Sequence, residues 1–202
     1  MKSTKRFAIA GGGISGLTLA IALQRKGLQV TVYEQASPIK PLGAGLVLAG
    51  NAMKAFAQIG IDEGVVKAGK VLKKLSIKDQ QGNMLTETDS EEVSRKFGVI
   101  NNFAIHRADL HEALLSYLPT ETVKLGKTCV DFEQTCAGVK LYFQDGSVEE
   151  TDYVIACDGI HSIFRKKLMP LHEPRYAGYT CWRAVIDNIL PTVKADETSE
   201  TW

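Results

Sequence analysis

The sequence predicts an α/β fold, because three adjacent segments near its start have the patterns of strand, helix and strand. Residues 7–10 form a short apolar run that suits a buried parallel strand. Residues 14–26 place apolar side chains at helical spacing and end at Gly27, a residue type that commonly stops helices. Residues 28–34 are rich in β-branched side chains and predict a second strand. Together these segments form a Rossmann-like βαβ unit.

The turn between the first strand and the helix carries the motif Gly11-x-Gly13-x-x-Gly16. In such a motif the first glycine takes a tight turn and the second lets the main chain approach a pyrophosphate. The third glycine lets the helix pack closely on the strand. The helix N-terminus offers free N–H groups and a partial positive charge to phosphates. Ser15 lies in the same turn and joins the three glycines as a candidate cofactor contact.

An acidic residue, Glu34, ends the second strand 18 residues after Gly16. This spacing suits a carboxylate that binds a ribose hydroxyl. A carboxylate there disfavours a 2′-phosphate, so the predicted nucleotide is FAD or NAD rather than NADP. Gln35, the next residue, is included among the candidate contacts. The alternative is a glycine-rich turn in an unrelated α/β protein, with Glu34 as a surface acid.

Composition and charge indicate which partners to expect. The chain has 202 residues, enough for one large domain or two small ones, and a net charge of +1. Lysines and arginines are scattered, and the longest basic cluster spans only residues 165–167. We therefore expect a small-molecule partner and neither nucleic acid nor a membrane surface. The sequence leaves the oligomeric state open.

Four cysteines occur without a CxxC pair and without histidines at zinc-ligand spacing. We expect reduced, mostly buried thiols in a cytoplasmic protein, and no metal site. The start of the chain, MKSTKRFAIAGGGISGLTLAIAL, has some features of a secretory signal peptide. Its crowded glycines disfavour that reading, and no segment has the roughly 20 uninterrupted apolar residues needed to span a bilayer.

Beyond Glu34 the chain alternates loops, strands and helices. A proline- and glycine-rich loop over 38–45 precedes an apolar run at 46–48 and a helical pattern at 51–58, with Asn51 as the expected N-cap. Alternating side chains and turn residues predict a hairpin over 72–88 and a strand over 128–135. A second hairpin is predicted within 139–159, with a type I′ turn at Asp145-Gly146. The chain then continues with a predicted buried strand at 153–157, a helix over 162–168 and a strand from Arg175 onward.

Three segments that follow Glu34 carry a resemblance to a known family. They read LGAGLVLAGNAMKAFAQIGI, IHRADLHEALL and YVIACDGIHSIFRKKL, in this order along the chain. With the glycine motif, they resemble the FAD-dependent aromatic hydroxylases, the single-component flavoprotein monooxygenases of the para-hydroxybenzoate hydroxylase type. The resemblance runs from residue 5 to about residue 183. It implies a Rossmann-like FAD-binding domain with part of a β-sheet substrate domain.

The resemblance also implies roles for particular residues. Ala44, Gly45 and Val47 correspond to a loop beside the isoalloxazine ring, and Arg107 to an arginine that reaches the FAD phosphate or ribose. Asp158 and Gly159 correspond to a turn beside the pyrophosphate and the docking NAD(P)H, and Ser162 and Arg165 complete the family's sequence motif there. Val130 corresponds to a contact at the adenine end. The alternatives are a surface arginine at 107 and an ordinary Asp-Gly turn at 158.

The implied function is that of an FAD-dependent monooxygenase. Such an enzyme uses NADH or NADPH and O₂ to oxygenate a small, usually aromatic molecule through a flavin C4a-hydroperoxide, and the cofactor supplies the chemistry. No residue is therefore assigned a catalytic role. Alternatives are a flavin-dependent reductase or dehydrogenase of the same fold, and a non-catalytic FAD- or NAD-binding fragment.

The resemblance implies a discontinuous division of the chain. Residues 1–70 and 98–170 would form the FAD-binding domain, and residues 71–97 and 171–202 part of the substrate-side sheet. A third fingerprint of the family, Gly-Asp followed by His and Pro, does not occur in this sequence. We therefore expect the chain to be the N-terminal portion of a longer protein.

Overall fold

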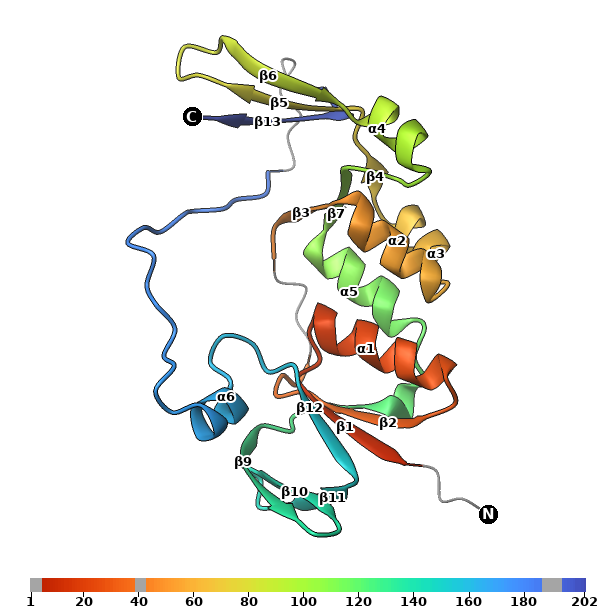
Figure 1. Cartoon of the computed structure of the whole chain (residues 1–202), viewed down its shortest axis with the longest axis vertical. Helices are drawn as coiled ribbons and strands as arrows, with labels where there is room; N and C mark the ends of the chain where they lie inside the picture. Colours follow the sequence, from red (N-terminus) through yellow and green to blue (C-terminus); the bar gives the residue numbers. More distant parts are fainter. Residues whose placement is uncertain (1–4, 39–42, 187–193) are drawn as a thin grey trace. The chain divides into compact units, whose positions relative to one another are not determined.

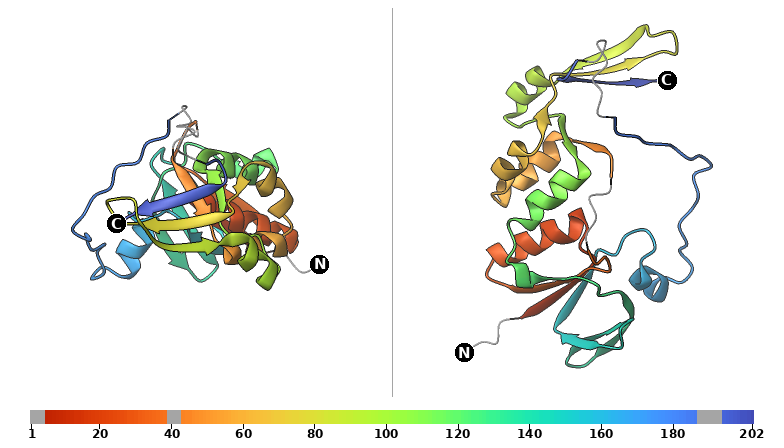
Figure 2. Two further views of the ribbon diagram at one scale, coloured as in Figure 1. Left: turned by 90° about the horizontal axis from the view of Figure 1, so that it is seen from above. Right: turned by 180° about the vertical axis from the view of Figure 1, so that it is seen from behind.

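The computed structural model describes residues 5–38, 43–186 and 194–202, and its chain forms two compact units. The first unit comprises Met1–Lys40 and Leu114–Cys181. The second comprises Pro41–Ala113 and Trp182–Trp202. Each unit is thus built from two stretches of chain that are far apart in sequence (Figures 1 and 2). The domain boundaries given above stay a prediction.

The first unit is built on a four-stranded parallel sheet, which confirms the predicted α/β fold class. Its strands, in spatial order, are β12 (Tyr153–Ala156), β1 (Arg6–Ala10), β2 (Gln29–Tyr33) and β8 (Val123–Lys124). Helix α1 (Ile14–Arg25) connects β1 to β2 and packs along the sheet (Figure 1). The predicted strand–helix–strand order is therefore confirmed. Gly27 follows the helix with a φ of 74°, the left-handed conformation that glycine adopts without strain.

A smaller antiparallel sheet belongs to the same unit. Its strands are β11 (Val148–Thr151), β10 (Gly138–Phe143) and β9 (Cys129–Thr135), followed along the chain by helix α6 (Ile163–Leu168). One buried cluster joins this sheet and α6 to the parallel sheet; it consists of Ala8, Ala10, Tyr33, Phe132, Leu141, Phe143 and Phe164. Within it, the Phe132 and Phe164 rings stack with centroids 4.7 Å apart.

The second unit contains two three-stranded sheets. One has the order β3 (Gly45–Leu48), β7 (Phe103–His106) and β4 (Lys70–Val71), and it is antiparallel. The other has the order β13 (Glu197–Thr201), β5 (Lys74–Lys78) and β6 (Met84–Asp89). The helices are α2 (Gly50–Gln58), α3 (Asp62–Lys67), α4 (Ser90–Phe97) and α5 (Arg107–Leu115). The Asp89 carboxylate caps α4 by accepting from the N–H groups of Glu91 and Glu92, at 2.9 and 3.0 Å.

The structure confirms the predicted hairpin over 72–88 and the strand over 128–135, but it corrects the turn at Asp145-Gly146. The Phe143 carbonyl accepts from the Gly146 N–H at 3.0 Å, and Gly146 has a φ of 82°. Asp145 does not have a positive φ, which a type I′ turn would require. The connection is therefore a three-residue loop that ends in a left-handed glycine.

Three further expectations about local structure are wrong. Helix α2 begins at Gly50 with Ala49 as its N-cap, because the Asn101 side chain, not Asn51, accepts the Gly50 N–H at 3.2 Å. Strand β12 is not buried, since it lies at the edge of its sheet and Tyr153 is 48% exposed. No strand forms over 175–186, where Trp182 is 97% exposed and no neighbouring strand offers a surface to pack on.

Candidate cofactor site

The glycine turn is held between two strand ends of the first unit. Gly11 has a φ of 104°, and its N–H donates to the Tyr33 carbonyl at 2.8 Å. A Cβ at Gly11 would lie 2.3 Å from the carbonyl oxygen of Cys157. Both the backbone conformation and the close approach therefore require glycine here. The turn sits at the carboxyl ends of β1, β2 and β12, where open α/β sheets bind their ligands.

The other two motif glycines have different surroundings. A Cβ at Gly16 would lie 2.0 Å from the Gly11 carbonyl oxygen, so this glycine allows α1 to pack against the turn. Gly13 is the N-cap of α1, with a φ of −74°, and a Cβ there would meet nothing within 4 Å. No side chain caps the helix, and Ser15 is exposed on its first turn. The amide groups at this helix end can therefore receive an anion.

The Glu34 carboxylate lies directly beside this turn. Its Oε2 accepts from the Gly12 N–H at 2.7 Å, and its Oε1 accepts from the Ala36 N–H at 2.8 Å. Each carboxylate oxygen has a second lone pair, so Glu34 can still accept from two hydroxyl groups of a ligand. Gln35 is exposed next to it. The structure thus brings together the glycine motif and the acid that the sequence singled out.

Gly12 is a site residue that the motif did not identify. A Cβ at this position would lie 2.9 Å from the Glu34 Cβ and 3.1 Å from its Oε2. The motif allows any residue between its first two glycines, so this constraint belongs to the packing of Glu34. The run of three consecutive glycines was the signal available in the sequence.

A third segment, residues 157–163, reaches the same strand ends. The Cys157 N–H donates to the Ala10 carbonyl at 2.7 Å, and Gly159 has a φ of 79°. The Asp158 Oδ2 accepts from the Ile163 N–H at 2.9 Å. The side chains of Asp158 and Ser162 share the capping of α6, since the Ser162 Oγ accepts from the N–H of residue 165 at 3.1 Å. Within the described chain, Nε and Nη2 of Arg165 are buried without a hydrogen-bond partner.

The expectation that the cysteines are mostly buried is wrong. Cys136 and Cys181 are exposed, whereas Cys129 and Cys157 are half-buried, and all four are free thiols. Burial, with a smaller contribution from the nearby Asp158 carboxylate, raises the pKa of the Cys129 thiol to about 11. Burial and then Asp158 also raise the pKa of Cys157. A raised pKa leaves less of the reactive thiolate at a given pH.

We therefore expect unequal alkylation at pH 8. Cys136 and Cys181 should react at least about 10-fold faster than Cys129, because they are exposed and because burial leaves less thiolate on Cys129. Peptide mass spectrometry over a time course measures the four rates, and the urea-unfolded protein, in which all four should react alike, is the control. Equal rates for Cys129 and Cys136 in the folded protein would contradict the burial described here.

In the second unit, the loop before β3 lies against Arg107. The Arg107 N–H donates to the Ala44 carbonyl at 3.1 Å. Gly43 has a φ of 147°, and a Cβ there would lie 2.8 Å from the Arg107 Cβ. His106 joins the same contact: its Nδ1 accepts from the Ala108 N–H at 3.2 Å, so its Nε2 donates to the Gly43 carbonyl at 3.1 Å. The predicted loop and the predicted arginine are therefore adjacent.

The remaining candidates have open surroundings. A Cβ at Gly45 would meet nothing within 4 Å, and the Val47 side chain is 49% exposed. The Val130 side chain, on β9 of the first unit, is also 49% exposed. No hydrogen bond or ring contact links Val130 to the glycine turn among the described residues. Its place at an adenine stays a prediction.

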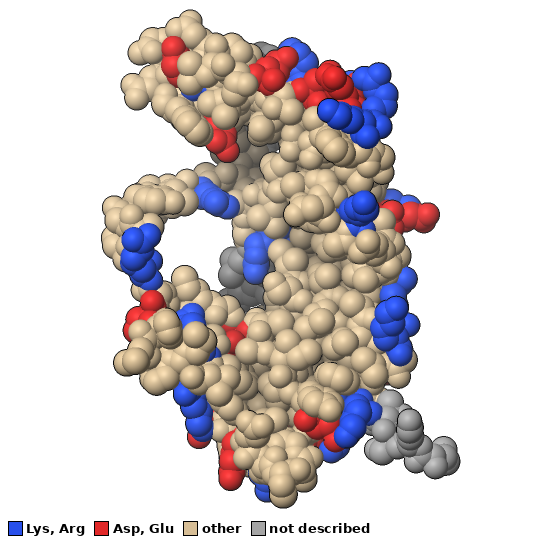
Figure 3. All heavy atoms as spheres, in the orientation of Figure 1, with Lys and Arg blue, Asp and Glu red and all other residues tan. Residues whose placement is uncertain are grey.

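Side chains of both charges lie on the face of the molecule drawn in Figure 3. Figure 3 shows basic and acidic side chains interspersed over the visible face. In the part of the chain that the structure describes, no three histidine, cysteine or acidic side chains gather as they would around a metal ion. Every helix of the described ranges is too short or too polar to cross a bilayer.

Comparison with known proteins identifies the family. Residues 5–185 match the family described as FAD binding domain. Aurachin C monooxygenase/isomerase of Stigmatella aurantiaca is 34% identical over 202 residues, which are 100% of this chain and 52% of that protein. 6-Hydroxynicotinate 3-monooxygenase of Pseudomonas fluorescens is 34% identical over 196 residues, or 96% of this chain and 50% of that protein. The chain thus spans about half the length of these curated relatives.

A solved structure supports the same relationship. Klebsiella pneumoniae HpxO, crystallised with FAD and uric acid, aligns with a TM-score of 0.74 and 28% sequence identity. The alignment covers 83% of this chain and 42% of that one. The chain therefore shares the fold of a protein that was crystallised with FAD.

Proposed function

The chain belongs to the FAD-binding domain family, and on this premise we propose that it forms part of an FAD-dependent monooxygenase that uses NADH or NADPH and O₂. The observation that carries the proposal is the glycine turn with Glu34 beside it. The turn has an open position at Gly13, a helix N-terminus without a side-chain cap, and a carboxylate 2.7 Å from the Gly12 amide. These residues fit the adenosine diphosphate half of FAD.

The chain's own residues have distinct tasks in this proposal. Gly13 lets the pyrophosphate approach the main chain, and the first amides of α1 donate to its oxygens. Glu34 accepts from the ribose hydroxyls with the lone pairs that its two amide contacts leave unused. Asp158 and Gly159 lie beside the pyrophosphate and the docking NAD(P)H, and Val130 lies at the adenine end.

Further proposed contacts come from residues 44–47 and from Arg107. Ala44, Gly45 and Val47 lie along the flavin ring, and Arg107 binds the phosphate or ribose region with its planar set of donors. The hydrogen bond from the Arg107 N–H to the Ala44 carbonyl supports this assignment, because it ties the arginine to the loop that would pass the flavin.

We propose a small aromatic molecule as the substrate. One of the relatives described above is named for 6-hydroxynicotinate, and HpxO was crystallised with uric acid. Bound FAD would supply the electron transfer and the activation of O₂, while the protein supplies binding and orientation. A cytoplasmic location is also proposed, supported by four free thiols. The apolar residues of the signal-like N-terminal stretch, moreover, build β1 and α1.

The test is oxygen incorporation by the complete natural protein. We expect a yellow protein that consumes NADH or NADPH when an aromatic acid is supplied, with one atom from labelled O₂ in the product. Labelled water without labelled O₂ is the control. Turnover without oxygen incorporation would indicate a reductase or dehydrogenase instead. A colourless protein that takes up no FAD would overturn the proposal.

A further inference from the structure

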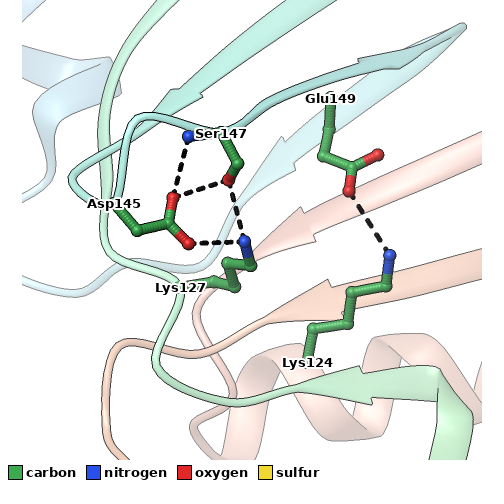
Figure 4. Close-up of polar contacts among 5 residues, drawn as sticks. All are labelled: Lys124, Lys127, Asp145, Ser147 and Glu149. Atoms are coloured by element: carbon green, nitrogen blue, oxygen red, sulfur yellow. Dashed lines mark hydrogen bonds and ion pairs between the residues drawn. The ribbon is translucent and has the colours of Figure 1, made fainter.

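Three side chains next to the candidate site form a compact polar cluster, here called the Lys127 clamp: Lys127, Asp145 and Ser147 (Figure 4). The Lys127 Nζ donates to Asp145 Oδ2 at 2.6 Å and to Ser147 Oγ at 2.8 Å. The Asp145 Oδ1 accepts from the Ser147 hydroxyl at 2.6 Å and from the Ser147 N–H at 3.0 Å. The clamp joins the loop that follows β8 to the turn between β10 and β11.

The lysine of the clamp is less exposed than the lysines of the neighbouring ion pairs. The Lys127 side chain is 22% exposed, whereas Lys140, which pairs with Glu150 at 3.0 Å, is 40% exposed. The Lys127 ammonium also lies 5.5 Å from the centroid of the Phe143 ring. The hydrogen bond from Lys127, followed by those from Ser147, holds the pKa of Asp145 well below its usual range. Asp145 is therefore ionised, and the lysine is charge-paired, at neutral pH.

The segment that carries Lys127 holds the main chain around Glu34. The Glu34 N–H donates to the Lys124 carbonyl at 2.9 Å, and the Glu34 carbonyl accepts from the Lys127 N–H at 2.8 Å. The Gly126 N–H donates to the Ala36 carbonyl at 3.2 Å. Both main-chain groups of Glu34 are thus fixed by residues 124–127. The position of Glu34 then fixes where its carboxylate meets the Gly12 and Ala36 amides.

The hairpin formed by β10 and β11, in turn, holds residues 124–127 in place. Besides the clamp, the Lys124 Nζ contacts Glu149 at 3.4 Å (Figure 4). The Gln144 N–H also donates to the Thr128 carbonyl at 2.9 Å. Of the two ion pairs, the clamp has the shorter contacts and the less exposed lysine. It is therefore the main side-chain link between the β10–β11 turn and the segment that supports Glu34.

We propose that the Lys127 clamp is a positioning device for the adenosine end of the FAD site. It fixes residues 124–127, these fix the main chain of Glu34, and Glu34 places its carboxylate at the glycine turn. The inference rests on the proposed function, because it takes the ribose of FAD as the ligand of Glu34. Lys127, Asp145 and Ser147 are positioning residues, and none of them is assigned a contact with the cofactor.

The test compares Lys127→Met with Lys140→Met. Methionine keeps much of the apolar stem but removes the ammonium, and Lys140 belongs to a surface pair of the same sheet. We expect the dissociation constant for FAD to rise roughly several-fold in K127M, because binding must then also order residues 124–127 and Glu34, and to stay unchanged in K140M. Asp145→Asn removes the charge while an amide oxygen can still accept from Ser147, so it should behave like K127M. Lys127→Arg should restore most of the affinity.

Amide exchange in the FAD-free protein separates positioning from general destabilisation. In K127M the Gly12 and Ala36 amides, which donate to Glu34, should exchange faster than in the unchanged protein. The Leu17 amide, which donates to the Gly13 carbonyl within α1, should not change. Unchanged exchange at Gly12, or equal acceleration at Leu17, would overturn the positioning role. A complete protein that binds no FAD would overturn the proposed function and the ligand assigned here, even if the Gly12 amide responded.

Discussion

Replacing Gly13 with alanine is expected to weaken FAD binding about 10- to 100-fold, the effect of forcing a methyl group into a close contact. The FAD-free protein should lose less than about 1 kcal/mol of stability, because a Cβ at this position meets nothing within 4 Å and the φ of −74° suits alanine. The methyl group would occupy space that the protein leaves open and that we assign to the pyrophosphate.

Isothermal titration with FAD and chemical unfolding of the FAD-free protein measure the two effects separately. Lys26→Ala, at the exposed far end of the same helix, is the control and should leave the FAD affinity unchanged. Unchanged FAD affinity in the Gly13 variant would show that the pyrophosphate does not approach this main chain.

Replacing Gly16 with alanine should mainly affect stability rather than FAD binding. We expect the free energy of unfolding to fall by about 3 kcal/mol or more. Within a helix, alanine is intrinsically favoured over glycine by about 1 kcal/mol, so helix propensity alone predicts stabilisation. Packing makes the substitution destabilising instead, because the new Cβ would lie 2.0 Å from the Gly11 carbonyl oxygen and 3.3 Å from Ile9 Cγ2. Neither the turn nor the buried Ile9 can move away without disturbing the sheet.

The free energy of unfolding of the FAD-free protein is the measurement, with the Gly13 variant as the control three positions earlier on the same turn. The melting temperature should fall by roughly 5–10 °C in the Gly16 variant, given the usual conversion for a domain of this size. A Gly16 variant as stable as the unchanged protein would contradict the close packing of α1 on the turn.

The βαβ start was predictable because its constraints are local. Gly11 is required by its own backbone conformation and Gly16 by a contact within the turn, and residues 28–34 are rich in β-branched side chains because they lie within a sheet. The helix after Asp158 was predictable for the same reason, since Ser162 and Asp158 cap it within a few residues. Such patterns need no information about distant parts of the chain.

The errors arose where distant segments decide the outcome. The segment after Arg175 has the side chains of a strand, but β propensity reflects packing on a neighbouring strand, and the described chain offers none there. The Gly50 N–H at the start of α2 donates to Asn101, about 50 residues away, so the prediction of Asn51 as the N-cap was wrong. Gly12 was missed because its constraint is the Glu34 side chain, which only the folded sheet brings close.

The position of β12 beside β1 bears on how the protein folds during synthesis. Phe7 pairs with Tyr153, so one edge of the first strand has no partner until residue 153 has emerged from the ribosome. At roughly 5–20 residues per second, that wait is on the order of ten seconds. The antiparallel hairpins β5–β6 and β10–β11 join near neighbours and can form as soon as they are made. A newly made chain therefore exposes an open strand edge for seconds, and at this stage it is most open to wrong pairing and to capture by chaperones.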